Sequence, residues 1–446
     1  MARARFSHTP DTLRAVAADA LAHARGKGAG ACEVEVSDGY GQTVTVRMGD
    51  VETIEYNRDK SLSVTVYIGK QKGYASTADL APLAIRDTVE AALTIARFTA
   101  ADECAGLAEP EALARDSKDL DLFHPWDLPV ERAIEMARSC ESAAFALDKR
   151  LSNSEGASVS CQQWQFVLAN SDGFMDGFPT SRHVLSCAVI AAEDGQMQRD
   201  DWYVSMRCPK DLPTPEAVGE YAGRRALARL GSRKIGTVQA PVLFEAPVAS
   251  GLIGGFVSAV SGGSLYRKAS FLLDSLGKEV FSPIVSLVER PHLMRGPASS
   301  WFDDEGVATR DRDIVRGGVL QGYFLGSYAG RKLGLKTTGN AGGNHNLILE
   351  SGESDLAGLI TTMGRGLLVT DLMGHGINLV TGDYSRGAAG YWVEGGEIRH
   401  PVDEITIAGN LRDMFRSIVA IGSDTLTRGS RSCGSILVEG MTIAGN

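Results

Sequence analysis

Leu62-Ser-Val-Thr-Val-Tyr-Ile68 alternates apolar and polar residues, which is the spacing of a β-strand with one buried face. The same alternation occurs upstream, in three segments at residues 32–36, 43–48 and 51–56. Short connections between successive strands favour antiparallel pairing. The first hundred residues are therefore predicted to contain an antiparallel sheet.

Two amphipathic helices are predicted, one before and one after these strands in the sequence. Thr9-Pro10-Asp11 opens the first helix, and Gly26 and Gly28 end it. The second helix has an apolar stripe formed by Ile85, Val89, Ala92, Leu93 and Ala96. Further along, a helix over about 130–147 precedes long strands at 154–208 and a helix that ends at Gly231. We therefore predict an N-terminal α+β domain over residues 1–231, with antiparallel strands and flanking helices.

Glycine indicates a second domain. The chain has 446 residues and 51 glycines, which are concentrated after residue 232. There, short β-type runs alternate with glycine turns, and Gly395-Gly396 is a hairpin signal. Residues 232–446 are therefore predicted to form a glycine-rich, mostly β C-terminal domain.

Composition limits the classes of function. The net charge of −10 disfavours nucleic-acid binding, which needs basic patches. Seven scattered cysteines without a CxxC pair fit free thiols in a reducing compartment. The N-terminus lacks an apolar signal region, and no apolar stretch reaches the roughly 20 residues of a spanning helix. We expect a cytoplasmic protein that binds neither nucleic acid nor membrane.

The histidines argue against a zinc site on one helix. Zinc hydrolases usually place two histidines on a helix beside a glutamate. The eight histidines here are far apart in the sequence, and none belongs to an HExxH-like pattern. A zinc site assembled from distant ligands stays open.

Two other segments contain groups that can carry chemistry. Cys433 lies between polar residues and glycine, which predicts partial exposure, but a reactive thiol also needs a basic or cationic neighbour. Trp301-Phe-Asp-Asp-Glu-Gly306 has three consecutive carboxylates. They suit a cation or a peptide amine, and they equally suit a solvated turn.

The segment Thr381-Gly-Asp-Tyr-Ser-Arg-Gly-Ala-Ala-Gly390 is the candidate for ligand binding. It places Asp383, Tyr384 and Arg386 among glycines, which permit close backbone approach to an extended ligand. A peptide groove and a plain turn with an internal Asp–Arg pair are the two interpretations.

Several long segments resemble the TldD/PmbA family, in its PmbA/TldE branch. The longest is Gly374-His-Gly-Ile-Asn-Leu-Val-Thr-Gly-Asp-Tyr-Ser-Arg-Gly-Ala-Ala-Gly-Tyr-Trp-Val-Glu-Gly-Gly-Glu-Ile398. The others include Gly262-Gly-Ser-Leu-Tyr-Arg-Lys-Ala-Ser-Phe271, Lys336-Thr-Thr-Gly-Asn340, Pro401-Val-Asp-Glu-Ile-Thr-Ile-Ala-Gly-Asn-Leu411 and Cys433-Gly-Ser-Ile-Leu-Val-Glu-Gly-Met-Thr-Ile-Ala-Gly445. The resemblance covers nearly the whole chain. Asn340 joins Asp383, Tyr384 and Arg386 as a candidate for the peptide groove.

The resemblance implies a two-component cytoplasmic metalloprotease of TldD and TldE chains. Such pairs act on unfolded peptides, remove leaders during microcin maturation and contribute to antitoxin turnover. The TldD branch binds zinc through HExxxH and a later cysteine. The corresponding stretch here resembles Gly251-Leu-Ile-Gly-Gly-Phe-Val-Ser-Ala-Val260, without histidine or carboxylate, so Cys433 is a remnant of the ligand set. The resemblance thus implies no cofactor on this chain and zinc on a TldD-type partner.

Three functions stay open from the sequence. The first is a zinc-free partner subunit that supplies the peptide channel of a heterodimer. The second is an autonomous peptidase that uses Cys433 or the cluster Asp303–Glu305. The third is a homodimeric peptide-binding protein. Catalytic residues are not identified.

Overall fold

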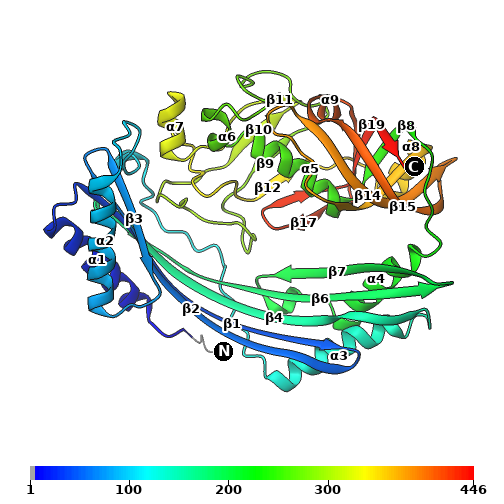
Figure 1. Cartoon of the computed structure of the whole chain (residues 1–446), viewed down its shortest axis with the longest axis horizontal. Coiled ribbons are helices and arrows are strands. Elements are labelled where there is room, and N and C mark those ends of the chain that lie inside the picture. The colour runs from blue at the N-terminus through cyan, green and yellow to red at the C-terminus, as the bar shows by residue number, and fades with distance from the viewer. Residues whose placement is uncertain (1–5, 446) are drawn as a thin grey trace. The chain divides into compact units, whose positions relative to one another are not determined.

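Figure 1 shows a computed structural model of the chain, in which residues 6–445 are described. The protein is a mixed α/β molecule with two compact units. The N-terminal unit runs to Leu227 and also takes in Met294–Gly296 and Trp301–Thr309. The C-terminal unit contains Ala228–Leu293, Pro297–Ser300 and the chain from Arg310 onward.

An antiparallel sheet in the order β3-β2-β1-β4-β6-β7 forms the centre of the N-terminal unit, and it curves like half of a barrel (Figure 1). Its strands are β1 (Ala31–Arg47), β2 (Asp50–Ile68), β3 (Gln71–Thr77), β4 (Leu151–Asn170), β6 (Pro179–Glu193) and β7 (Gln196–Met206), and the short β5 (Met175–Asp176) pairs with β4. The helices of this half are α1 (Pro10–Gly26), α2 (Pro82–Phe98), α3 (Val130–Phe145) and α4 (Pro215–Ala228). The predicted α+β arrangement of sheet and helices is therefore present.

Strands β1 and β2 are longer than the separate segments predicted from alternation. They pair without interruption from Ala31 opposite Tyr67 to a tight turn at Met48 and Gly49, with one register shift near the turn. Gly39, in the middle of β1, breaks the apolar pattern in the sequence. In the structure, the Trp164 ring of the neighbouring strand occupies the space that a side chain at Gly39 would need. The strand continues because a side chain from β4 covers the glycine.

The buried face of this sheet packs against α1 and α2. Every third or fourth residue of α1 is fully buried: Leu13, Ala17, Ala20 and Ala24. They meet Val34 and Val64, which alternate along β1 and β2, in one apolar cluster. Burial of this helical stripe against the strand face supplies the core of this part of the unit.

The C-terminal unit contains a barrel of five strands within the described chain, because β15 pairs with both β14 and β19. The barrel strands are β8 (Val238–Phe244), β13 (Arg365–Met373), β14 (Asp383–Glu394), β15 (Glu397–Asn410) and β19 (Ile436–Ala444), and β16 (Ile418–Ile421) adds to β19. The predicted Gly395-Gly396 hairpin joins β14 to β15, with φ of 66° and 75° at the two glycines.

A second, mixed sheet lies in the same unit, in the order β11-β10-β9-β12-β18-β17. Its strands are β9 (Leu287–Glu289), β10 (Arg312–Arg316), β11 (Val319–Leu320), β12 (Leu347–Leu349), β17 (Leu426–Arg428) and β18 (Arg431–Cys433). The unit also contains helices, namely α5 (Ala246–Ala259), α6 (Gly262–Tyr266), α7 (Ser327–Leu333), α8 (Leu356–Met363) and α9 (Leu411–Arg416). It is therefore mixed in composition, although its glycine-rich sequence predicted mostly β structure.

Helix α5 forms despite three glycines because its apolar residues are buried in the core of the unit. Leu252, Ile253 and Phe256 are buried in the main core of the C-terminal unit. Tertiary burial thus outweighs a helix propensity that is about 1 kcal/mol worse for each glycine than for alanine. Across residues 6–445, no helix has the length and apolar character needed to cross a lipid bilayer.

Candidate functional site

The predicted groove segment begins β14, at one end of the barrel. Asp383 is exposed, and its carboxylate accepts hydrogen bonds from Thr381 Oγ1 at 2.6 Å and Asn410 Nδ2 at 3.2 Å. These two donors, Thr381 first, lower the pKa of Asp383. The carboxylate is therefore ionised at neutral pH and available at the surface.

Tyr384 and Arg386 lie on the opposite side of β14 from Asp383, because side chains alternate along a strand. Tyr384 is buried in the barrel core, where burial raises its pKa to about 12 although the nearby Arg386 acts in the other direction. Arg386 is partly buried and donates to Leu372 O at 3.3 Å. Its Nε is buried without a hydrogen-bond partner in residues 6–445. The structure thus brings Tyr384 and Arg386 together, while Asp383 uses Thr381 and Asn410 in place of the anticipated Asp–Arg pair.

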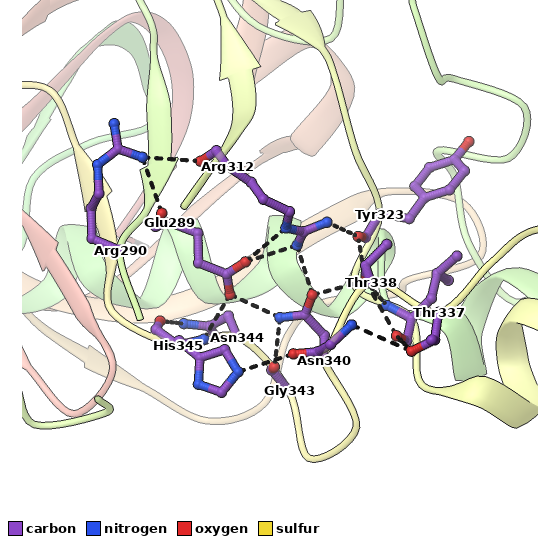
Figure 2. Close-up of polar contacts among 12 residues, drawn as sticks. Glu289, Arg290, Arg312, Tyr323, Thr337, Thr338, Asn340, Gly343, Asn344 and His345 are labelled. Carbon is purple, nitrogen blue, oxygen red and sulfur yellow. Dashed lines mark hydrogen bonds and ion pairs between the residues drawn. The ribbon is translucent and has the colours of Figure 1, made fainter. Parts of the chain in front are cut away.

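Asn340 belongs to a different group of residues, a buried polar network beside β9 and β10 (Figure 2). The Glu289 carboxylate accepts from Arg312 Nη2, Asn340 Nδ2 and the His345 backbone N–H, each at 2.8 Å. Asn340 Oδ1 in turn accepts from Arg312 Nη2 at 2.7 Å and from Thr338 Oγ1 at 2.8 Å. Asn340 is only 4% exposed. Its amide is therefore fully engaged in holding the loop that follows α7.

The charged pair at the centre of this network is a feature that the sequence did not reveal. Glu289 and Arg312 are separated by 23 positions, and both side chains are at most 10% exposed. Buried ion pairs need further hydrogen bonds to offset the loss of hydration, and Asn340 and His345 provide them here. No motif in the sequence links these residues, so only the fold could identify the set.

Cys433 is buried, so the expected partial exposure is wrong. The residue is 1% exposed, and its Sγ lies 3.7 Å from Ala246 O at the start of α5. Burial raises the pKa of the thiol to about 12, against a lowering effect of Arg431. Because the nucleophilic form of cysteine is the thiolate, burial disfavours this thiol as a nucleophile at neutral pH.

The acidic segment at Trp301–Gly306 forms a tight turn in the N-terminal unit. Asp303 is 2% exposed and accepts the backbone N–H groups of Glu305 and Val307, both at 2.9 Å. Glu305 and Asp303 lie close enough to Glu33 on β1 to raise its pKa, which reaches about 8, with burial as the larger cause. The turn is thus organised by Asp303, which is buried rather than solvated.

The residues around Cys433 do not fit a zinc ion. The side of α5 that faces solvent carries Gly251 and Ser258, with the partly buried Gly254 between them, so it offers no imidazole or carboxylate. A catalytic zinc takes about three protein ligands and a water. Residues 6–445 contain no group of three or more His, Cys, Asp or Glu side chains that could hold a metal ion.

Comparisons with known proteins match the chain along most of its length. Three family models match: PmbA/TldA metallopeptidase domain 1 at residues 32–96, the central domain at 123–230 and the C-terminal domain at 237–445. The "Metalloprotease PmbA" of Escherichia coli O157:H7 is 51% identical over 433 residues, which cover 97% of this chain and 96% of that protein. The "Metalloprotease TldD homolog" of Haemophilus influenzae is 24% identical, and the match covers 89% of this chain and 85% of that protein.

A solved structure shows the same fold. The crystal structure of a candidate modulator of DNA gyrase from Bacteroides thetaiotaomicron superposes with a TM-score of 0.93 at 28% identity, covering 98% of this chain and 100% of that chain. Sequence and structure agree over both units. The chain therefore belongs to the PmbA/TldD family of metalloproteases.

Proposed function

We propose that this chain is the zinc-free subunit of a two-component cytoplasmic protease that acts on unfolded peptides, including leader peptides and antitoxins. In this proposal it supplies part of the peptide-binding channel, and a TldD-type partner carries the zinc and cuts the peptide. The measurable relation to a TldD homolog supports a partner built on a similar plan. Seven free cysteines among the described residues support a reducing compartment.

The observation that carries the proposal is the chemistry of α5 and Cys433. The helix presents glycine and serine to solvent, and the neighbouring thiol is buried and protonated. A metalloprotease family member with this donor set is poorly equipped to hold zinc by itself. An autonomous mechanism through Cys433 is disfavoured for the same reason, since the thiolate is not accessible.

Peptide capture is the role that the remaining features support. Strand β17 ends its sheet, so within the described residues one of its edges has no strand partner. Edge strands bind extended peptides through backbone hydrogen bonds, which tolerates many sequences. In the proposed peptide groove, the exposed Asp383 would contact the peptide, while Arg386, Tyr384 and Asn340, which are partly or fully buried, would support the neighbouring backbone.

The test is a peptidase assay on an unfolded peptide with this chain alone, a TldD-type chain alone, and the two mixed, with zinc quantified in each. We expect cleavage in the mixture only, and zinc with the TldD-type chain. Cys433→Ser should leave the activity of the mixture unchanged. Chelator-insensitive cleavage by this chain alone would overturn the proposal, and a stable homodimer that binds peptide but never joins the partner would favour a homodimeric binding protein.

A further inference from the structure

Two arginines face each other on the hairpin of β17 and β18. Arg428 is the cross-strand partner of Arg431, and the turn between them contains Gly429 with φ of 58°. Side chains of directly opposed residues in an antiparallel pair lie on the same face of the sheet, and like charges there are destabilising. The hairpin therefore concentrates positive charge at its turn.

The guanidinium of Arg431 lies against the backbone of α5. A Cβ atom at Gly254 would overlap Arg431 Nη1, so the glycine leaves the room in which this charged group sits. Arg431 Nε is buried and has no hydrogen-bond partner in the described part of the chain. A buried guanidinium donor without a partner costs free energy, and an added acceptor would recover it.

The solvent-facing side of α5 next to Gly254 carries no large side chain. Gly251, one turn before Gly254, is exposed, and a Cβ placed there would meet no atom within 4 Å. Ser258, one turn after Gly254, is also exposed. Asp424 has an electrostatic effect on the nearby Cys433, and its carboxylate is held by the N–H and hydroxyl of Ser435 at 2.9 and 2.6 Å. Asp424 is therefore already engaged.

We propose that Arg431, assisted by Arg428, is a carboxylate-binding site for peptides on the exposed side of α5. The inference rests on the proposed peptide-binding function and adds a substrate preference to it. A guanidinium presents parallel N–H donors that match the two oxygens of a carboxylate. A bound carboxylate would accept from the guanidinium of Arg431 and offset its positive charge. The carboxylate comes either from the C-terminus of the peptide or from an acidic side chain.

The experiment measures binding of fluorescent unfolded peptides to the full chain by anisotropy. Three peptides share one sequence: one with a free C-terminus and an acidic residue, one with the C-terminus amidated, and one with the acidic residue replaced by glutamine. We expect Arg431→Met to weaken binding about 10- to 100-fold for peptides that keep the recognised carboxylate. Arg431→Met should not weaken binding of the peptide that lacks the recognised carboxylate. The unaffected peptide therefore shows whether the C-terminus or the acidic side chain is bound.

Three further variants separate binding from folding. Arg431→Lys keeps the charge but not the paired donors, so it should restore binding only in part. Gly254→Ala should keep or raise the stability of α5, because alanine is the better helix former, yet weaken binding by displacing the guanidinium. Arg399→Met removes a half-exposed arginine of the same unit and is the matched control, with no expected change.

Failure of this inference is distinguishable from failure of the proposed function. Wild-type binding that ignores all carboxylates, with cleavage by the mixture intact, would overturn the carboxylate site alone. If the wild type binds no peptide, acetate decides the matter, because it should raise the thermal unfolding temperature of the wild type and not of Arg431→Met. An equal effect of acetate on both proteins would overturn the site, as would a response to inorganic phosphate with none to acetate.

Discussion

At the scale of single residues, burial determines which predicted groups keep a chemical role. Cys433 and Asn340 are both in segments that resemble the family, but the thiol is protonated in the core and the amide is saturated by Glu289 and Arg312. Asp383 is exposed at the start of β14, whereas Arg386 on the other face of the strand is partly buried. The sequence shows which segments carry polar groups, whereas burial and long-range partners set the contacts of each residue.

Glu33 gives the N-terminal unit a dependence on pH. Burial and the nearby Glu305 raise its pKa from 4.5 to about 8 in the folded state. Between these values the folded chain holds a proton that the unfolded chain has released, so stability falls as pH rises from about 4.5 to about 8. Glu33→Gln should remove this pH-dependent loss of stability. The free energy of unfolding of the variant minus that of the wild type should therefore increase from about pH 4.5 to about pH 8 and then stay constant.

Urea unfolding of the N-terminal unit at pH 5, 6, 7 and 8 measures this effect. The exposed Glu52→Gln on β2 is the control, and its difference from the wild type should stay constant with pH. A stability difference between Glu33→Gln and the wild type that does not change between pH 5 and 8 would contradict the raised pKa.

At the scale of elements, strand alternation and apolar helix stripes predicted most of the N-terminal unit. Glycines inside strands and helices interrupt these patterns, so the sequence did not show where such elements continue or which elements pack together. Gly39 interrupts the apolar pattern of β1, although Trp164 of β4 completes it in space. Helix α5 contains Gly254 and Gly255 and forms because its apolar residues are buried in the core of the C-terminal unit. Both cases depend on residues more than a hundred positions away, which local spacing does not report.

Gly73 on β3 is the contact point of helix α2. A Cβ at this position would overlap the carbonyl oxygen of Ala92 and crowd Ala96, which are part of the helix backbone. Gly73→Ala should therefore push α2 away from the sheet and lower the free energy of unfolding by about 1–3 kcal/mol. Gly26→Ala at the end of α1 is the control, because its Cβ would meet no atom within 4 Å. Equal unfolding midpoints for the two variants would show that α2 does not pack this closely.

At the scale of the whole molecule, the units are not continuous in sequence. The boundary at residue 231 stays a prediction, and the compact N-terminal unit also takes in Met294–Gly296 and Trp301–Thr309. Backbone hydrogen bonds of 2.9 Å join Ala114 to Gly306 and Ala308 to Ala112. The three carboxylates of this segment are evident in the sequence, but no local pattern indicates that Trp301 and Phe302 pack with residues far upstream.

Phe302 tests this arrangement, because its partners lie in the first half of the chain. Its ring centroid lies 5.1 Å from that of Phe174 and 5.7 Å from that of Phe178. Phe302→Ala should lower the stability of the N-terminal unit by about 3–5 kcal/mol, as truncation of a buried phenylalanine does. Phe98→Ala, at a residue 87% exposed on α2, should change it by less than about 0.5 kcal/mol.

Hydrogen exchange measured by mass spectrometry resolves where the Phe302→Ala effect falls. Amides of β4 should lose protection, because Leu168 of that strand packs in the same apolar cluster as Phe302. The fragment 1–231 should show the same loss, since it lacks Trp301 and Phe302 and leaves the cluster open to water. If Phe302→Ala instead increased exchange only in the barrel strands β8 and β13, the segment would belong to the C-terminal unit, and the N-terminal domain would be continuous in sequence after all.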